Sequence, residues 1–95
     1  MQALTVTLLT DFEHPGETEE ITVTTCTKDQ TRWEMHAAKR DWPSQTKIPT
    51  VYANFMAWSA LKRANRTELD FEDFADTVEA VHADITEVNP TRTGV

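Results

Sequence analysis

One segment, residues 51–63, most constrains what this chain can fold into. Its apolar side chains recur at three- and four-residue spacing, which is typical of an amphipathic helix. They are Val51, Tyr52, Phe55, Met56, Trp58, Ala60 and Leu61. Placed 100° apart, Tyr52, Phe55, Met56 and Trp58 alone cover about half of the helix circumference. We therefore predict a central helix over residues 49–64 that is covered on two sides.

Two segments before this helix alternate apolar and polar residues, as strands do. Leu4, Val6 and Leu8 alternate with threonines in the first, and Ile21 and Val23 do so in the second. Pro15-Gly16 between them is a turn signal. We predict a β-hairpin with strands over about residues 3–10 and 20–26.

Two further helices are predicted on either side of the central one. Thr27 and Gln30 have the spacing of a capping box, which starts a helix over about residues 28–40. Asp70 is a suitable cap for a helix over about residues 71–83, with apolar residues such as Phe74 on one side. The predicted fold class is α+β: an N-terminal β-hairpin packed on a bundle of three helices. A single domain would span residues 1–85, and residues 86–95 would form a flexible, disordered tail.

Charge is unevenly distributed along the chain. The net charge of −7 argues against an ordinary nucleic-acid binder. Residues 28–66 hold eight basic and three acidic residues, a net charge of +5, whereas residues 67–88 hold eight acidic residues and no Lys or Arg. One explanation of this uneven charge is that both segments form solvated faces that keep a small protein from aggregating. The alternative is self-association between opposite charges, for which the candidates are Lys62, Arg63, Glu72 and Asp76.

The sequence offers little for catalysis or for a cofactor. The three histidines are far apart, Cys26 is the only cysteine, and two glycines are too few for a phosphate-binding loop. We predict a protein that is not an enzyme and binds neither metal nor cofactor. A lone cysteine also fits a reducing cytosol. No segment approaches the roughly 18 apolar residues of a membrane helix, and no signal peptide is recognisable, so we expect no membrane contact.

Protein binding is the remaining class of function. Aromatic and Met side chains are favoured on surfaces that adapt to a partner helix. Trp33, Trp42, Tyr52 and Met56 are the candidates for contacting a partner, and packing in the core is the alternative for each. If Met56 lies on such a surface, Met56→Asp should abolish binding and leave the fold intact.

An ordered set of short motifs resembles the tail assembly chaperones of long-tailed bacteriophages, especially those of actinobacteria. The resemblance covers about residues 4–82. Its motifs are Thr-Val-Thr at residues 5–7, Asp-Phe-Glu-His at 11–14, Arg-Trp at 32–33, Ala-Lys-Arg-Asp-Trp-Pro-Ser at 38–44, Phe-Met-Ala-Trp-Ser-Ala-Leu-Lys-Arg at 55–63 and Leu-Asp-Phe-Glu-Asp-Phe at 69–74. One departure is Asn65, where the family pattern leads us to expect glycine after the central helix. This departure affects only the helix cap.

The resemblance implies a protein of the host cell cytoplasm that is absent from the mature virion. It would bind the tape measure protein, keep it soluble and help to recruit the tail tube protein. It also implies a homo-oligomer and a longer form of the same protein made by ribosomal frameshift, this chain being the short form. The family has no catalytic residues.

Two other functions stay open on the sequence. A permanent virion component at the head–tail junction is one. The other is an acidic DNA mimic that inhibits a host nuclease, suggested by Glu72, Asp73, Asp76 and Glu79. The basic segment before residue 67 argues against the mimic, because a mimic needs a whole surface of one sign.

Overall fold

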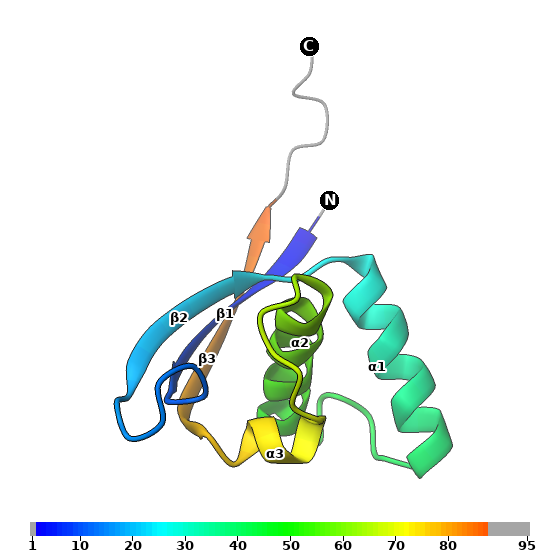
Figure 1. Ribbon diagram of the computed structural model, residues 1–95. Coiled ribbons are helices and arrows are strands. Elements are labelled where there is room, and N and C mark those ends of the chain that lie inside the picture. Colours follow the sequence, from blue (N-terminus) through cyan, green and yellow to red (C-terminus); the bar gives the residue numbers. More distant parts are fainter. Residues whose placement is uncertain (1, 88–95) are drawn as a thin grey trace.

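A computed structural model describes residues 2–87 of the chain. Its elements in chain order are β1 (Gln2–Thr10), β2 (Glu19–Thr24), α1 (Thr27–Arg40), α2 (Pro49–Arg63), α3 (Phe71–Ala75) and β3 (Val78–Glu87). The three strands form one antiparallel sheet, and the helices lie on one side of it (Figure 1). The predicted α+β class is confirmed.

The predicted hairpin is present. β1 pairs antiparallel with β2, with Val6 opposite Val23 and Leu8 opposite Ile21. In the connecting loop Gly16 has φ 88°, a conformation that glycine adopts at no steric cost, and its N–H donates to the Asp11 carboxylate (2.9 Å). The alternation seen in the sequence therefore places the apolar residues of both strands on one face.

The predicted third helix is wrong beyond Ala75. α3 has only five residues, and Val78–Glu87 forms a strand that pairs antiparallel with β1, so that the sheet order is β2-β1-β3. Thr77 ends α3: its hydroxyl donates to the Phe74 carbonyl (2.6 Å) and lies 2.8 Å from the buried Thr10 hydroxyl. The predicted tail also begins too early, because β3 reaches Glu87; the rest of that prediction falls outside the described residues.

Tertiary pairing explains this difference. The apolar residues Phe71, Phe74, Ala75, Val78 and Val81 recur at helical spacing, but Val81, Ala83 and Ile85 also alternate with polar residues, as in a strand. As a strand, the segment pairs with the second edge of β1 and supplies hydrogen-bond partners to the backbone groups there. This stabilisation by backbone pairing exists only in the folded sheet, so the local periodicity of the sequence does not reveal it.

The central helix predicted from the sequence is α2, and it packs against the inner face of the sheet (Figure 1). One core cluster lies between α2 and the sheet, and a second, around Trp33 and Phe55, lies between α2 and α1. Coverage on two sides is thereby confirmed. Pro49 occupies the first turn, and Asn65, with φ 60°, adopts the left-handed conformation just after the helix, as its sequence position suggested.

The cap of α1 lies one residue earlier than predicted. The helix starts at Thr27, so Cys26 is the cap residue, and the Asp29 carboxylate accepts the Cys26 N–H (2.9 Å) in the place predicted for Gln30. Asp29 is buried, and it also accepts the Ser59 hydroxyl (2.6 Å) and the Arg63 guanidinium (2.9 Å) from α2. One carboxylate therefore joins the start of α1 to the end of α2.

Replacing Asp29 by Ala should destabilise the protein. The change leaves the buried Ser59 hydroxyl without its partner and removes the counter-charge of Arg63. We expect a loss of about 2–4 kcal/mol in the free energy of unfolding, measured by urea denaturation. Glu34→Ala, on the exposed side of the same helix, is the control and should change it by about 0.5 kcal/mol or less. An equally small effect for Asp29→Ala would contradict this role.

The Asp29 contacts should also appear in the pH dependence of stability. Burial raises the pKa of Asp29, but hydrogen bonds from Arg63, Ser59 and the Cys26 N–H, with the charge of Arg63, outweigh it and hold the pKa below its ordinary value of 3.8. A lowered folded-state pKa stabilises the fold at pH above 3.8, and this stabilisation is lost as pH falls through the folded value. In Arg63→Ala, acid unfolding monitored by circular dichroism should begin at higher pH than in the wild type. If the variant and the wild type unfold at the same pH, the ion pair between Asp29 and Arg63 does not stabilise the fold.

Candidate partner-binding groove

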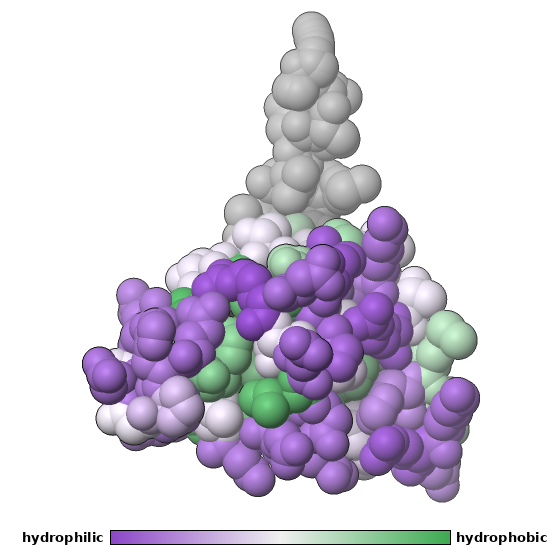
Figure 2. Space-filling model, viewed as in Figure 1, coloured by the Kyte–Doolittle hydropathy of each residue, from purple (hydrophilic) through white to green (hydrophobic). Residues whose placement is uncertain are grey.

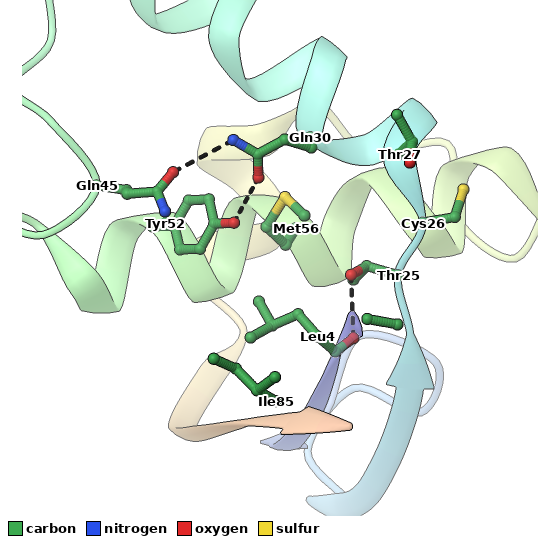
Figure 3. A pocket seen from close by; sticks show the side chains of 10 residues that line it. Leu4, Thr25, Cys26, Thr27, Gln30, Gln45, Tyr52, Met56 and Ile85 are labelled. Carbon is green, nitrogen blue, oxygen red and sulfur yellow. Dashed lines mark hydrogen bonds between the residues drawn. The ribbon is translucent and has the colours of Figure 1, made fainter. Parts of the chain in front are cut away.

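An open groove of about 330 Å³ lies where the start of α1, the first half of α2 and one end of the sheet meet (Figure 3). The N-terminal end of β1 and the C-terminal end of β3 share that end of the sheet (Figure 1). The groove is lined by Ala3, Leu4, Thr25, Cys26, Thr27, Gln30, Gln45, Tyr52, Met56 and Ile85. None of these ten described side chains is an acidic or basic one.

The floor of the groove is apolar. Leu4 and Ile85 are opposite each other on β1 and β3, and their side chains lie on the side of the sheet that faces Met56 of α2 (Figure 3). Ile85 is 69% exposed, the most exposed large apolar side chain among the described residues. An apolar inner face of the sheet therefore stays open to a partner at this end.

The rim of the groove is polar and hydrogen-bonded. The Tyr52 hydroxyl donates to the Gln30 side-chain carbonyl (2.6 Å), and the Gln30 amide donates to the Gln45 side-chain carbonyl (3.3 Å) (Figure 3). Burial raises the pKa of Tyr52, and the nearby charge of Glu34 adds to this effect. The phenol therefore stays protonated at neutral pH. Side chains from α1, the α1–α2 connection and α2 are held in one row.

The structure separates the four predicted partner-binding residues. Tyr52 and Met56 line the groove, although Met56 is only 2% exposed and belongs to the core. Trp33 is 3% exposed and packs on Tyr52 and Trp42, so the expectation that it contacts a partner is not supported. Trp42 is half-buried outside the groove.

An aromatic cluster inside the chain accounts for Trp42. Its ring contacts His36 (4.8 Å between centroids) and Phe71 (6.0 Å), which belong to α1 and α3. Burial, followed by the charges of Arg40 and Lys39, lowers the pKa of His36, which keeps its imidazole neutral at neutral pH. Trp42 thus joins the end of α1 to the start of α3.

The residues predicted for self-association have contacts within their own chain. Arg63 forms an ion pair with Asp29, and the Glu72 carboxylate lies 3.9 Å from Arg40. The Lys62 ammonium lies 5.6 Å from the centroid of the Trp58 ring. Asp76 is exposed at the end of α3. Arg63 is thereby engaged within the chain, and self-association through Lys62, Glu72 and Asp76 stays a prediction.

Eight of the ten lining residues were not predicted to contact a partner, among them Leu4 and Ile85 of the floor and Gln30 and Gln45 of the rim. Ile85 is the most informative of them. The alternation of Val81, Ala83 and Ile85 would have placed it on the inner face of a strand, had the segment been interpreted as one. The two glutamines carry no pattern, because only the packing of α1 against α2 brings them together.

A second groove lies along α1, but three of its lining side chains are Lys or Arg. The face shown in Figure 2 is mostly hydrophilic, and its hydrophobic areas are small and separate. Within residues 2–87, no group of three His, Cys, Asp or Glu side chains could hold a metal ion. In the same part of the chain, no helix has the length and apolar character needed to cross a bilayer.

A carboxylate introduced at Met56 should lower the free energy of unfolding far more than one introduced at Ile85. Met56→Asp buries a carboxylate without a partner, so we expect a loss of about 4 kcal/mol or more, enough to unfold a domain of ordinary stability. This corrects the expectation that the Met56 variant keeps its fold. Ile85→Asp should cost about 1 kcal/mol, because the side chain reaches water. Urea denaturation of both variants tests this, and a fully folded Met56→Asp protein would contradict it.

Comparisons with known proteins found no relatives. A scan against protein-family models found no matching family, and neither a search of curated proteins nor a search of solved structures found a match. Function is therefore inferred from the groove and from the sequence resemblance.

Proposed function

We propose that this chain is a tail assembly chaperone of a long-tailed bacteriophage and that its groove holds a helical segment of the tape measure protein. The observation that carries the proposal is the apolar floor, in which Ile85 is exposed, Leu4 is half-buried and Met56 lies buried behind them. An amphipathic helix binds in such a groove by inserting apolar side chains spaced three and four residues apart.

The chemistry of the groove suits an apolar helix face better than a charged ligand. Its lining side chains are uncharged, and Leu4 and the exposed Ile85 offer apolar surface beside the buried Met56. The amide groups of Gln30 and Gln45 can bond polar groups at the edge of a bound helix. Binding driven by apolar burial depends weakly on salt, which separates this function from recognition of phosphates.

The charge of the chain fits the same function. A net charge of −7 on a bound chaperone adds negative charge to its client and opposes aggregation of the complex. In this proposal the protein acts in the host cytoplasm with the tail tube protein and its own longer form, and leaves before the virion is complete.

The structure gives the DNA-mimic alternative less support than the sequence alone did. It placed four acidic residues on one helix, but Glu79 lies on β3, where its carboxylate accepts the Thr18 hydroxyl. Glu72, Asp73 and Asp76 lie on or beside the short α3. A row of three acids on one turn of helix does not reproduce a run of phosphates.

Co-expression with the tape measure protein from the same genome tests the proposal. The wild-type chain should move that protein from the pellet into the soluble fraction and co-purify with it, in 50 mM and 500 mM salt alike. Ile85→Asp should reduce co-purification about tenfold or more, because it places a charge on the open floor. Leu9→Asp is the matched control: Leu9 is 41% exposed on the opposite face of the sheet, and its variant should bind as the wild type does.

Two results would overturn the proposal. One is a tape measure protein that stays insoluble when both this chain and its longer form are present. The other is equal binding by the Ile85→Asp and Leu9→Asp variants, with circular dichroism showing both folded. Mass spectrometry of purified virions distinguishes the remaining alternative, because a permanent head–tail component would be found there and a chaperone would not.

A further inference from the structure

The strand β3 presents a long free edge. The sheet order β2-β1-β3 leaves its second edge without a strand partner among residues 2–87. Natural edge strands are commonly protected by charged side chains, especially Lys, by Pro, by bulges or by short length. β3 has ten residues, with the sequence Val-Glu-Ala-Val-His-Ala-Asp-Ile-Thr-Glu, and contains neither Lys nor Pro; its bulge lies at the start of the strand, and the Asp84 carboxylate is paired with His82 of the same strand. Such an edge can accept another strand.

Pairing within the sheet identifies the groups on this edge. The Thr25 N–H donates to the Leu4 carbonyl, so the even-numbered residues of β1 bond toward β2 and the odd-numbered ones toward β3. The partners of Thr5 and Thr7 on β3 are Asp84 and His82, whose backbone groups therefore point toward β1. The intervening residues, Val81, Ala83 and Ile85, direct their N–H and C=O groups to the free edge.

The outer face of this edge is complementary to itself. His82 and Asp84 are both exposed there, with the imidazole Nε2 3.0 Å from the carboxylate. If a second copy pairs antiparallel with β3 about Ala83, each His82 lies opposite Asp84 of the other copy. The four side chains then alternate as donor and acceptor, and an imidazole can donate to a carboxylate whether neutral or protonated.

The inner face favours the same register. Pairing about Ala83 places Val81 opposite Ile85 of the other copy, which partly covers an exposed apolar side chain. A register centred on His82 or on Asp84 would place like residues opposite each other, two imidazoles or two carboxylates. Glu79 stays outside the contact, because it lies beside the bulge at the start of β3 and bonds Thr18.

We propose that two copies of this chain join their β3 strands antiparallel about Ala83 and form one continuous sheet. Three pairs of residues, Val81 with Ile85, Ala83 with Ala83, and Ile85 with Val81, exchange backbone hydrogen bonds across the twofold axis. The contact differs from the charged surfaces predicted from the sequence. It does not depend on the proposed function, although the Ile85 side chain also lines the groove.

Analytical ultracentrifugation of the full chain over about 10 μM to 1 mM tests this contact. The wild type should show a concentration-dependent monomer–dimer equilibrium. Ala83→Pro removes an N–H that points to the free edge and leaves the bonds to β1, so it should be folded and monomeric over the same range. Thr22→Pro makes the same change at the free edge of β2, where the even-numbered residues point outward, and should dimerise as the wild type does.

Charge variants provide a second test that needs no proline. His82→Asp places carboxylates opposite each other and should weaken the dimer about tenfold or more. The double variant His82→Asp/Asp84→His exchanges the two groups and should restore most of the lost affinity.

Several results would overturn the edge contact. They are a wild type that stays monomeric at 1 mM, an Ala83→Pro chain that dimerises normally, and a Thr22→Pro chain that alone loses the dimer. Failure of the double variant to regain affinity would also count against it. Monomeric Ala83→Pro keeps the groove, so its co-purification with the tape measure protein reports on the proposed function separately from the dimer.

Discussion

The arrangement of the helices depends on the buried carboxylate of Asp29. Three kinds of donor converge on it: a backbone N–H at the start of α1, the Ser59 hydroxyl and the Arg63 guanidinium of α2. A buried carboxylate is tolerated only when its hydrogen bonds are complete. This requirement makes alternative positions of α1 on α2 unfavourable, whereas the apolar contacts between the two helices would tolerate some sliding.

The position of α1 in turn creates the groove. With its first turn fixed beside α2, Gln30 reaches both Tyr52 and Gln45 and forms the polar rim. α2 covers the middle of the sheet and leaves the end that carries Leu4 and Ile85 open (Figure 3). An open apolar surface thus arises because one helix does not cover the three-stranded sheet to its end.

Much of the architecture was predictable from local patterns. The hairpin follows from alternation in β1 and β2, and the central helix follows from the wide apolar stripe that begins at Val51. The Asp70 cap and the left-handed Asn65 were also anticipated, because caps depend on neighbouring residues only. Of the groove, Tyr52 and Met56 were anticipated, but the distinction between exposed and buried aromatic residues was not. Trp33 and Met56 are core residues, because side chains of other elements pack against them.

The sequence by itself determined which segments bury apolar surface and where two of the three helices and the first two strands lie. The tertiary structure alone decided the fate of residues 78–87. Their pattern suits a continued helix or a strand, and the free edge of β1 made the strand the better choice, because it pairs backbone groups on both sides. That choice brought Ile85 to the groove and His82 and Asp84 to an open edge. Such long-range pairing lies outside the reach of three- and four-residue periodicity.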